Sequence, residues 1–164
     1  NPKEDRILTW DFAIENDEFT VGPATVLGNP TLYQVESIKA DKHYQTLLVA
    51  EEMKEHHKIM ALDLMTGEVI KEDLGNFNRG NDPEGIALVM NKDNNGYWIC
   101  TEQSKTDNRF HLYDRKTLEY MTTMYLDNVS YTDGIATAYM HGKWFLYAVD
   151  NDARVVAFEL PEIN

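Results

Sequence analysis

The chain has 164 residues and a hydrophobic fraction of 43%, which suits one ordinary domain with a core and excludes a disordered segment. Its formal net charge of −13 argues against nucleic acid and anionic membranes as direct partners, because both carry dense negative charge. No apolar run approaches the length of a membrane span and no signal peptide opens the sequence, so we expect a mature form or a fragment without a targeting segment.

Strand-like runs can be followed along the chain in order. Residues 1–28 contain the first, RILTWDF (6–12), with an acid near its end. The same kind of run returns three times: KIMALDL (58–64), RFHLYDR (109–115) and RVVAFEL (154–160). These runs are rich in β-branched and aromatic residues and lie between Gly, Asn and Asp turns, which favours strands over helices.

Each returning run follows another strand-like run with a polar or acidic end: TLLVAEE (46–52), GYWICTEQ (96–103) and KWFLYAVDN (143–151). Each of those follows a further short strand: LYQVESIKA (32–40), PEGIALVM (83–90) and TDGIATAY (132–139). The segment MKEHHKIMALDLM (53–65) can be drawn as a helix, but its place in the repeat predicts a loop and then a strand. Cys100 is the single cysteine, which excludes an internal disulfide, and its apolar surroundings predict a buried, inert thiol.

The repeat contains about four short strands in about 49 residues, which predicts an all-β fold, a β-propeller of four-stranded antiparallel blades. We interpret the partial domain 1–164 as the outer strands of one blade (1–28), two blades (29–75 and 76–127) and a last blade (128–164). About three and a half blades cannot close a ring, and an open stack of sheets exposes unpaired edges. We therefore expect a longer chain or a second copy to complete the propeller.

An acid recurs at the same place in three units. Glu36, Glu84 and Asp133 coincide when the units are aligned, and the last two precede Gly85 and Gly134. The first strand of a propeller blade lines the central channel, so these carboxylates are predicted to form a ring that repels itself unless a cation is present. Oxygen ligands without a Cys or His cluster favour calcium. A glycine after the acid permits a bulge or a close approach of the backbone.

A second ring is suggested where the second strand of each unit ends. Two sets of residues correspond there: Glu52, Gln103 and Asn151, and also Glu51, Glu102 and Asp150. A carboxamide among carboxylates supplies a neutral oxygen, which calcium accepts. The alternative is purely structural, because an acid followed by glycine is also a common turn pair that a repeat protein would reuse.

Three segments resemble the β-propeller phytases. They are DPEGIALVMNKDNNGYWICTEQSKTDNRFHLYDR (82–115), SYTDGIATA (130–138) and VESIKADKHYQTLLVAEE (35–52). The similarity spans roughly residues 7–160 and corresponds to the C-terminal half of the family. The resemblance implies a six-bladed propeller that is secreted or periplasmic.

The same resemblance implies a function and a set of site residues. Members of the family release phosphate from inositol hexakisphosphate with calcium ions in the central channel and a calcium-activated water. Carried onto this sequence, Glu36, Glu84, Gln103 and Asp133 would be calcium ligands, and Glu52 would be the catalytic residue at the phosphate-facing site. Calcium also explains how so acidic a chain could bind a phosphorylated substrate, because the metal charge dominates its surroundings.

The sequence departs from the family in ways that leave other functions open. Ser37 replaces the expected glycine after Glu36, and the family's basic phosphate contacts and one tyrosine belong to its N-terminal half, which has no counterpart here. The chain thus carries about half a site. The alternatives are a non-catalytic calcium-binding propeller module for a ligand or partner, and a calcium-dependent lactonase-like or esterase-like hydrolase.

Other metal-like or basic features are better explained structurally. Residues 91–102 have near-matches to a helix-loop-helix calcium loop, but GYWICTE is strand-like, which favours a hairpin turn. His56 and His57 are expected in a solvated loop, because no third ligand lies at a telling distance. Four basic residues are expected at the surface and would contact phosphate if they face the channel mouth: Lys54, Lys58, Lys105 and Arg109.

Overall fold

The computed structural model of the chain describes residues 7–28, 30–78, 80–106 and 108–161. Parts of the first and last predicted units, 1–6 and 162–164, lie outside the described residues. All regular structure in the described ranges is β, and all paired strands are antiparallel. None of the described residues forms a helix of the length and apolarity that crossing a lipid bilayer requires.

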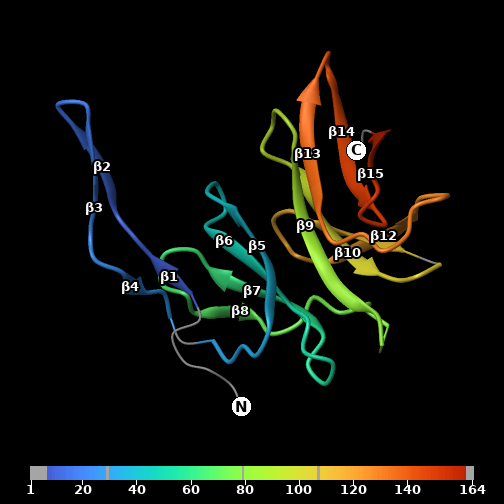
Figure 1. Cartoon of the computed structure of the whole chain (residues 1–164), viewed down its shortest axis with the longest axis horizontal. Coiled ribbons are helices and arrows are strands. Elements are labelled where there is room, and N and C mark those ends of the chain that lie inside the picture. The colour runs from blue at the N-terminus through green and yellow to red at the C-terminus, as the bar shows by residue number, and fades with distance from the viewer. Residues whose placement is uncertain (1–6, 29, 79, 107, 162–164) are drawn as a thin grey trace.

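Two complete four-stranded sheets form the middle of the molecule (Figure 1). The first contains β5 (Val35–Asp41), β6 (Thr46–Glu51), β7 (Lys58–Asp63) and β8 (Val69–Lys71). The second contains β9 (Asp82–Met90), β10 (Gly96–Gln103), β11 (Arg109–Asp114) and β12 (Tyr120–Tyr125). Strands adjacent in the sequence are adjacent in each sheet, so both are simple meanders. The predicted fold class is therefore confirmed.

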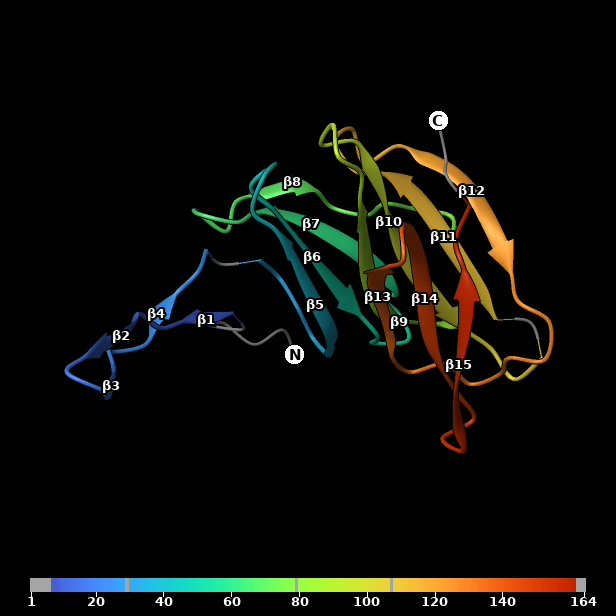
Figure 2. The same ribbon diagram turned by 90° about the horizontal axis from the view of Figure 1, so that it is seen from above.

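The remaining strands form smaller units. One is a three-stranded sheet of β13 (Ile135–Met140), β14 (Lys143–Asp150) and β15 (Arg154–Glu159). The others are two pairs near the N-terminus: β1 (Leu8–Thr9) with β4 (Thr25–Val26), and β2 (Phe12–Glu15) with β3 (Glu18–Val21). Together these pairs make a long ribbon, 7–27, that extends away from the three sheets (Figures 1 and 2). As the repeat predicts, the segment 53–65 is a loop followed by β7.

The core lies between neighbouring sheets. Strand β10 shows this best, because its side chains alternate between two clusters. Trp98 and Cys100 pack with side chains of the β5–β8 sheet, whereas Tyr97 and Ile99 pack with side chains of the β13–β15 sheet. Both faces of this blade are therefore buried, which explains the continuous apolar run in its sequence. Cys100 is a buried free thiol, as predicted.

A buried ion pair joins the two four-stranded sheets. Arg115 follows β11 and donates from Nε and Nη2 to the carboxylate of Asp41 at the end of β5, at 2.6 and 2.8 Å. Both side chains are at most 3% exposed. A third Arg115 nitrogen donates to the carbonyl of Asn94. The contact holds one end of β5 against the neighbouring blade.

The first strands of the three sheets lie side by side. β9 contacts β5 on one side and β13 on the other. The hydroxyl of Ser37 in β5 donates to the carbonyl of Glu84, and the hydroxyl of Thr137 in β13 donates to the carbonyl of Leu88 at 2.8 Å. The residues that begin these three strands are thereby brought to one end of the molecule.

Candidate metal-binding site

Equivalent β-bulges contain two of the predicted ring acids, Glu84 and Glu36. Between β9 and β10, Pro83 pairs with Glu102 and Ile86 pairs with Cys100, so two residues, 84–85, face one residue of β10. Between β5 and β6 the same shift places residues 36–37 opposite a single residue. A bulge of this kind bends the strand and redirects a side chain. The pairing of an acid with a small residue is thus the sequence signature of the bulge.

The small residue after the acid is required by a neighbouring strand. A Cβ on Gly85 would lie 2.8 Å from the backbone nitrogen of Ile135 in β13, so the predicted close approach is confirmed there. Ser37 occupies the equivalent position in the first blade, and its hydroxyl reaches the carbonyl of Glu84. The departure from glycine therefore adds a hydrogen bond between adjacent inner strands.

The predicted acids share one electrostatic environment. Glu84 is 4% exposed, and its pKa is raised to about 8 by burial and then by the negative charges of Glu36, Glu52, Asp133 and Asp82. The pKa of Glu36 is raised by burial, by the charge of Glu52, by a hydrogen bond between those two carboxyls, and by Asp133. The structure therefore gathers the four predicted carboxylates, Glu36, Glu52, Glu84 and Asp133, which we call the acid cluster.

Gln103 belongs to the same site. It ends β10, and its Nε2 donates to Oδ1 of Asp133. Burial, a hydrogen bond between the carboxyls of Asp133 and Asp152, and the charge of Asp152 raise the pKa of Asp133, and the bond from Gln103 lowers it in part. The amide oxygen of Gln103 is the atom that would face a cation, because its nitrogen is already used as a donor.

Asp82 and Asp152 are site residues that sequence reasoning missed. Asp82 opens β9 two residues before Glu84, and Asp152 lies in the turn after β14. Both raise the pKa of a member of the acid cluster. The spacing Asp82-Pro83-Glu84 was the available signal for the first. For the second, the repeat offers no corresponding acid.

The expectation of a solvated loop is wrong for His57. Its side chain is 7% exposed and its Nε2 lies 3.1 Å from Oδ1 of Asp82, although neither ring nitrogen has a hydrogen-bond partner within the described residues. His56 stacks on Tyr33 with a distance of 4.1 Å between ring centroids. The β6–β7 loop therefore folds against the segments that lead into β5 and β9.

The helix-loop-helix resemblance of residues 91–102 has no structural counterpart. Residues 91–95 form the tight β9–β10 turn, in which the amide of Asn91 donates to the carbonyl of Asn95 at 2.9 Å. Asp93 accepts from the backbone and side chain of Asn95. Glu102 lies at the opposite end of β10. The hairpin interpretation is confirmed.

The donor set of the acid cluster suits a hard cation. It consists of carboxylate and amide oxygens, and Oε2 of Glu84 is buried without a hydrogen-bond partner in the described structure. A bound cation would relieve both this missing contact and the mutual repulsion of the acids. Across the described ranges, however, no three Asp, Glu, His or Cys side chains stand close enough to hold one ion. The chemistry fits calcium, and the carboxylates would have to draw together around it.

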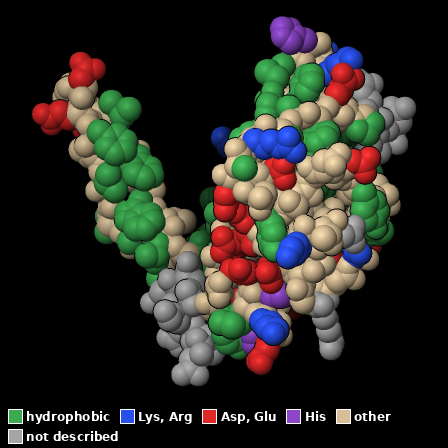
Figure 3. Space-filling model, turned by 45° about the vertical axis from the view of Figure 1, so that its right-hand side comes forward, with side chains coloured by type: hydrophobic (Ala, Val, Ile, Leu, Met, Phe, Trp, Pro, Cys, Tyr) green, Lys and Arg blue, Asp and Glu red, His purple; other side chains and the backbone are tan. Residues whose placement is uncertain are grey.

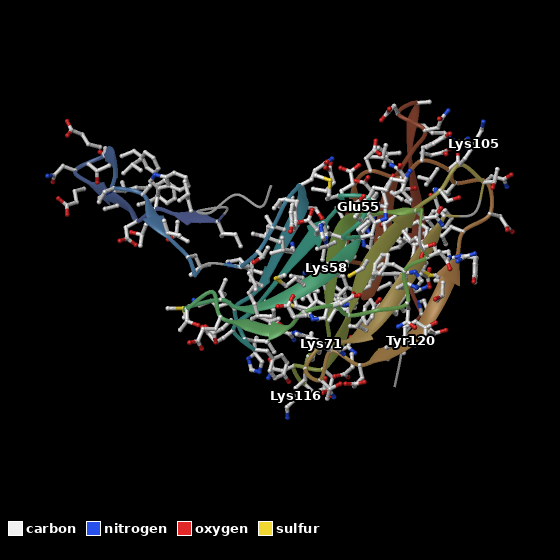
Figure 4. All side chains as sticks on the ribbon, turned by 90° about the horizontal axis from the view of Figure 1, so that it is seen from below. Glu55, Lys58, Lys71, Lys105, Lys116 and Tyr120 are labelled. Atoms are coloured by element: carbon white, nitrogen blue, oxygen red, sulfur yellow. The ribbon has the colours of Figure 1, made fainter. Side chains whose placement is uncertain are left out.

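The four candidate basic residues are dispersed. Lys58 of β7 pairs with Glu72 at 3.1 Å, and Arg109 contacts Glu102 at 3.4 Å. Lys105 projects from the β10–β11 loop at the edge of the body (Figure 4) and lines a hollow of about 690 Å³ with Arg154. Lys54 is exposed in the β6–β7 loop. Another hollow, of about 770 Å³, lies at the opposite end of β5 and β9 beside Arg115, away from the acid cluster.

Comparison with known proteins places the chain in a family. A search of curated proteins returned no match. The family model described as Phytase matches residues 27–143, which include both four-stranded sheets, β13, and all five predicted site residues. This match covers more than half of the 164 residues, and the chain therefore belongs to the phytase family.

Proposed function

We propose that the chain is part of a calcium-dependent phosphomonoesterase that hydrolyses phosphate from inositol hexakisphosphate, in a secreted or periplasmic setting. The observation that carries the proposal is the acid cluster, whose buried member Glu84 has a pKa of about 8 and an oxygen without a partner in the described structure. Membership of the phytase family supports a phosphatase-like hydrolase.

Each residue of the site has a distinct role in this proposal. Glu36, Glu84 and Asp133 would bind calcium from three adjacent inner strands, and Gln103 would add a neutral oxygen. Glu52 lies at the end of β6 beside Glu36 and would face the phosphate. When bound, calcium supplies positive charge for the phosphoryl oxygens and activates water for hydrolysis. The buried position of Glu84 strengthens every charge interaction at the site.

The exposed ribbon supports the expectation that more protein completes the propeller. Large apolar side chains lie along it with 41–74% of their surfaces exposed: Leu8, Trp10, Phe12, Ile14, Phe19, Val21 and Val26. They form a continuous stripe on the ribbon (Figure 3). A two-stranded ribbon is marginally stable by itself, and an apolar surface of this kind needs a covering partner. A second chain, or an N-terminal half of the propeller, would cover it and supply further phosphate contacts.

One observation favours a second candidate, a calcium-binding module without catalysis. The largest charge effects on the pKa of Glu84 and of Glu36 come from acids. In this second candidate the acids would bind calcium, and no basic side chain beside them would hold phosphate. Such a module would bind calcium and release no phosphate.

Phosphate release from inositol hexakisphosphate separates the two functions. With the protein that completes the propeller present, we expect release in millimolar calcium, loss of release in EDTA, and loss in Asp133→Asn, because the metal would no longer be held. Asp93→Asn, in the distant β9–β10 turn, is the matched control and should release phosphate at the wild-type rate. Calcium binding without any phosphate release would favour the non-catalytic module.

A further inference from the structure

Three buried acids next to the proposed site share one arrangement. Glu51 and Asp150 end β6 and β14, and Glu102 is the last residue but one of β10; they immediately precede Glu52, Asn151 and Gln103, respectively. Their exposed fractions are 0%, 0% and 6%. They adjoin the acid cluster in sequence, but their carboxylates accept hydrogen bonds from the segments before the inner strands.

In the first blade, Glu51 holds the segment that leads into β5. Its carboxylate oxygens accept from the backbone amides of Tyr33 and Gln34 at 2.5 and 2.7 Å, and one accepts from Met53 at 3.1 Å. The side chain of Gln34 in turn donates to the carboxylate of Glu52. One buried acid thus fixes the approach to Glu36 and the surroundings of Glu52 together.

In the second blade, Glu102 does the same for the segment before β9. It accepts from the backbone and side chain of Asn78 at 3.0 and 2.7 Å, and from the side chain of Asn81 at 2.7 Å. Nε2 of His111 lies 2.8 Å from Oε2 of Glu102. Burial opposes the ionisation of Glu102, but the bonds from His111, Asn81 and Asn78 more than offset it and hold its pKa at about 2. Its oxygens are occupied, so it is unsuited to bind a metal.

In the third sheet, Asp150 holds the segment before β13. It accepts from the backbone amide of Ser130 at 3.0 Å, and Arg154 donates to it at 2.7 Å. The amide of Asn151 donates back to the carbonyl of Ser130 at 2.9 Å. The loop that carries Asp133 is therefore tied to the end of β14 in the same way as in the other two blades.

We propose that Glu51, Glu102 and Asp150 are positioning residues that hold the calcium ligands in place from behind. Each carboxylate fixes two segments at once, one that carries a ring acid and one that carries Glu52, Gln103 or Asn151. The inference rests on the proposed calcium site. Partners of this kind, one step behind the ligands, typically alter metal affinity by about 10–100-fold when they are replaced.

The test is the calcium dissociation constant, measured by calorimetry on the purified chain. We expect Glu51→Gln and Glu102→Gln to weaken calcium binding by about 10–100-fold, because the new amide group turns a donor toward backbone and side-chain donors. Asp150→Asn should have a smaller effect, since its Oδ1 can still accept from Ser130. Asn81→Ala removes one loop-side bond to Glu102, and serves as a milder second variant where Glu102→Gln does not fold.

Two acids elsewhere in the blades provide a matched control. Asp63 and Asp114 also accept backbone amides, those of Met65 and Thr66 and those of Lys116 and Thr117, but in the turns at the other end of the strands. Asp63→Asn and Asp114→Asn should lower the melting temperature in EDTA and leave the calcium dissociation constant unchanged. A purely structural role for Glu51 and Glu102 would give them this same behaviour and would overturn the inference. Absence of calcium binding by the wild-type chain would overturn the proposed function instead.

Discussion

At the two ends of the inner strands, the pKa values of buried carboxylates are shifted in opposite directions. Where β5 ends, Asp41 is 2% exposed, and its bonds from Arg115 and the backbone lower its pKa against the effect of burial. Where β9 begins, Glu84 is 4% exposed and its pKa rises to about 8, because burial raises it and the charges of neighbouring acids raise it further. Two carboxyls that are equally buried thus have pKa values shifted in opposite directions, and the hydrogen-bonding and charged groups around each carboxyl determine the direction. One end is a buried ion pair, and the other is a cluster of acids that repel one another.

The largest expected effect comes from breaking the ion pair between Asp41 and Arg115. Arg115→Ala leaves the Asp41 carboxylate buried without its charged partner, which should destabilise the fold by about 3–5 kcal/mol. Chemical denaturation would measure the change. The matched control is Lys58→Ala, which removes an exposed pair with Glu72 and should alter stability by less than about 1 kcal/mol. Equal losses in the two variants would contradict the contrast between the ends.

A smaller effect on stability should come from the titration of Glu84 in the acid cluster. The pKa of Glu84 is about 8 in the folded chain and 4.5 as its ordinary value, so the unfolded chain binds fewer protons between these pH values. Without calcium, stability should therefore fall as pH rises from 4.5 to about 8, by on the order of 3 kcal/mol. Denaturation in EDTA at pH 5 and pH 8 would show it. Glu84→Gln should flatten most of this slope, and a slope unchanged by that substitution would contradict the assignment.

The repeat in the sequence predicted the fold class and three of the four members of the acid cluster; Glu52 came from the family resemblance. Periodic short strands indicated blades, and alignment of the units placed Glu36, Glu84 and Asp133 together. Strand register supplied what the sequence could not. Glu51 and Glu52 are adjacent acids of the same type. Only the bulge and the alternation of side chains along the strand show that Glu51 faces the loop before β5 and that Glu52 faces the acid cluster.

Long-range contacts were also beyond the sequence. Asp41 and Arg115 are 74 residues apart, and no local pattern links them. The burial of His57 depends on how a loop of one blade folds against the entry to the next. Such contacts arise where one blade packs on the next. A sequence repeat predicts that neighbouring blades pack together, but it does not predict which residues meet.

The most direct test of the account is the melting temperature of the chain in millimolar calcium and in EDTA. A ligand that binds only the folded state adds about 2.7 kcal/mol of stability at one hundred times its dissociation constant, so calcium should raise the melting temperature clearly. Glu84→Ala and Asp133→Ala should each remove most of that rise. A melting temperature that is the same in calcium and in EDTA would contradict the assignment of the acid cluster as a calcium site.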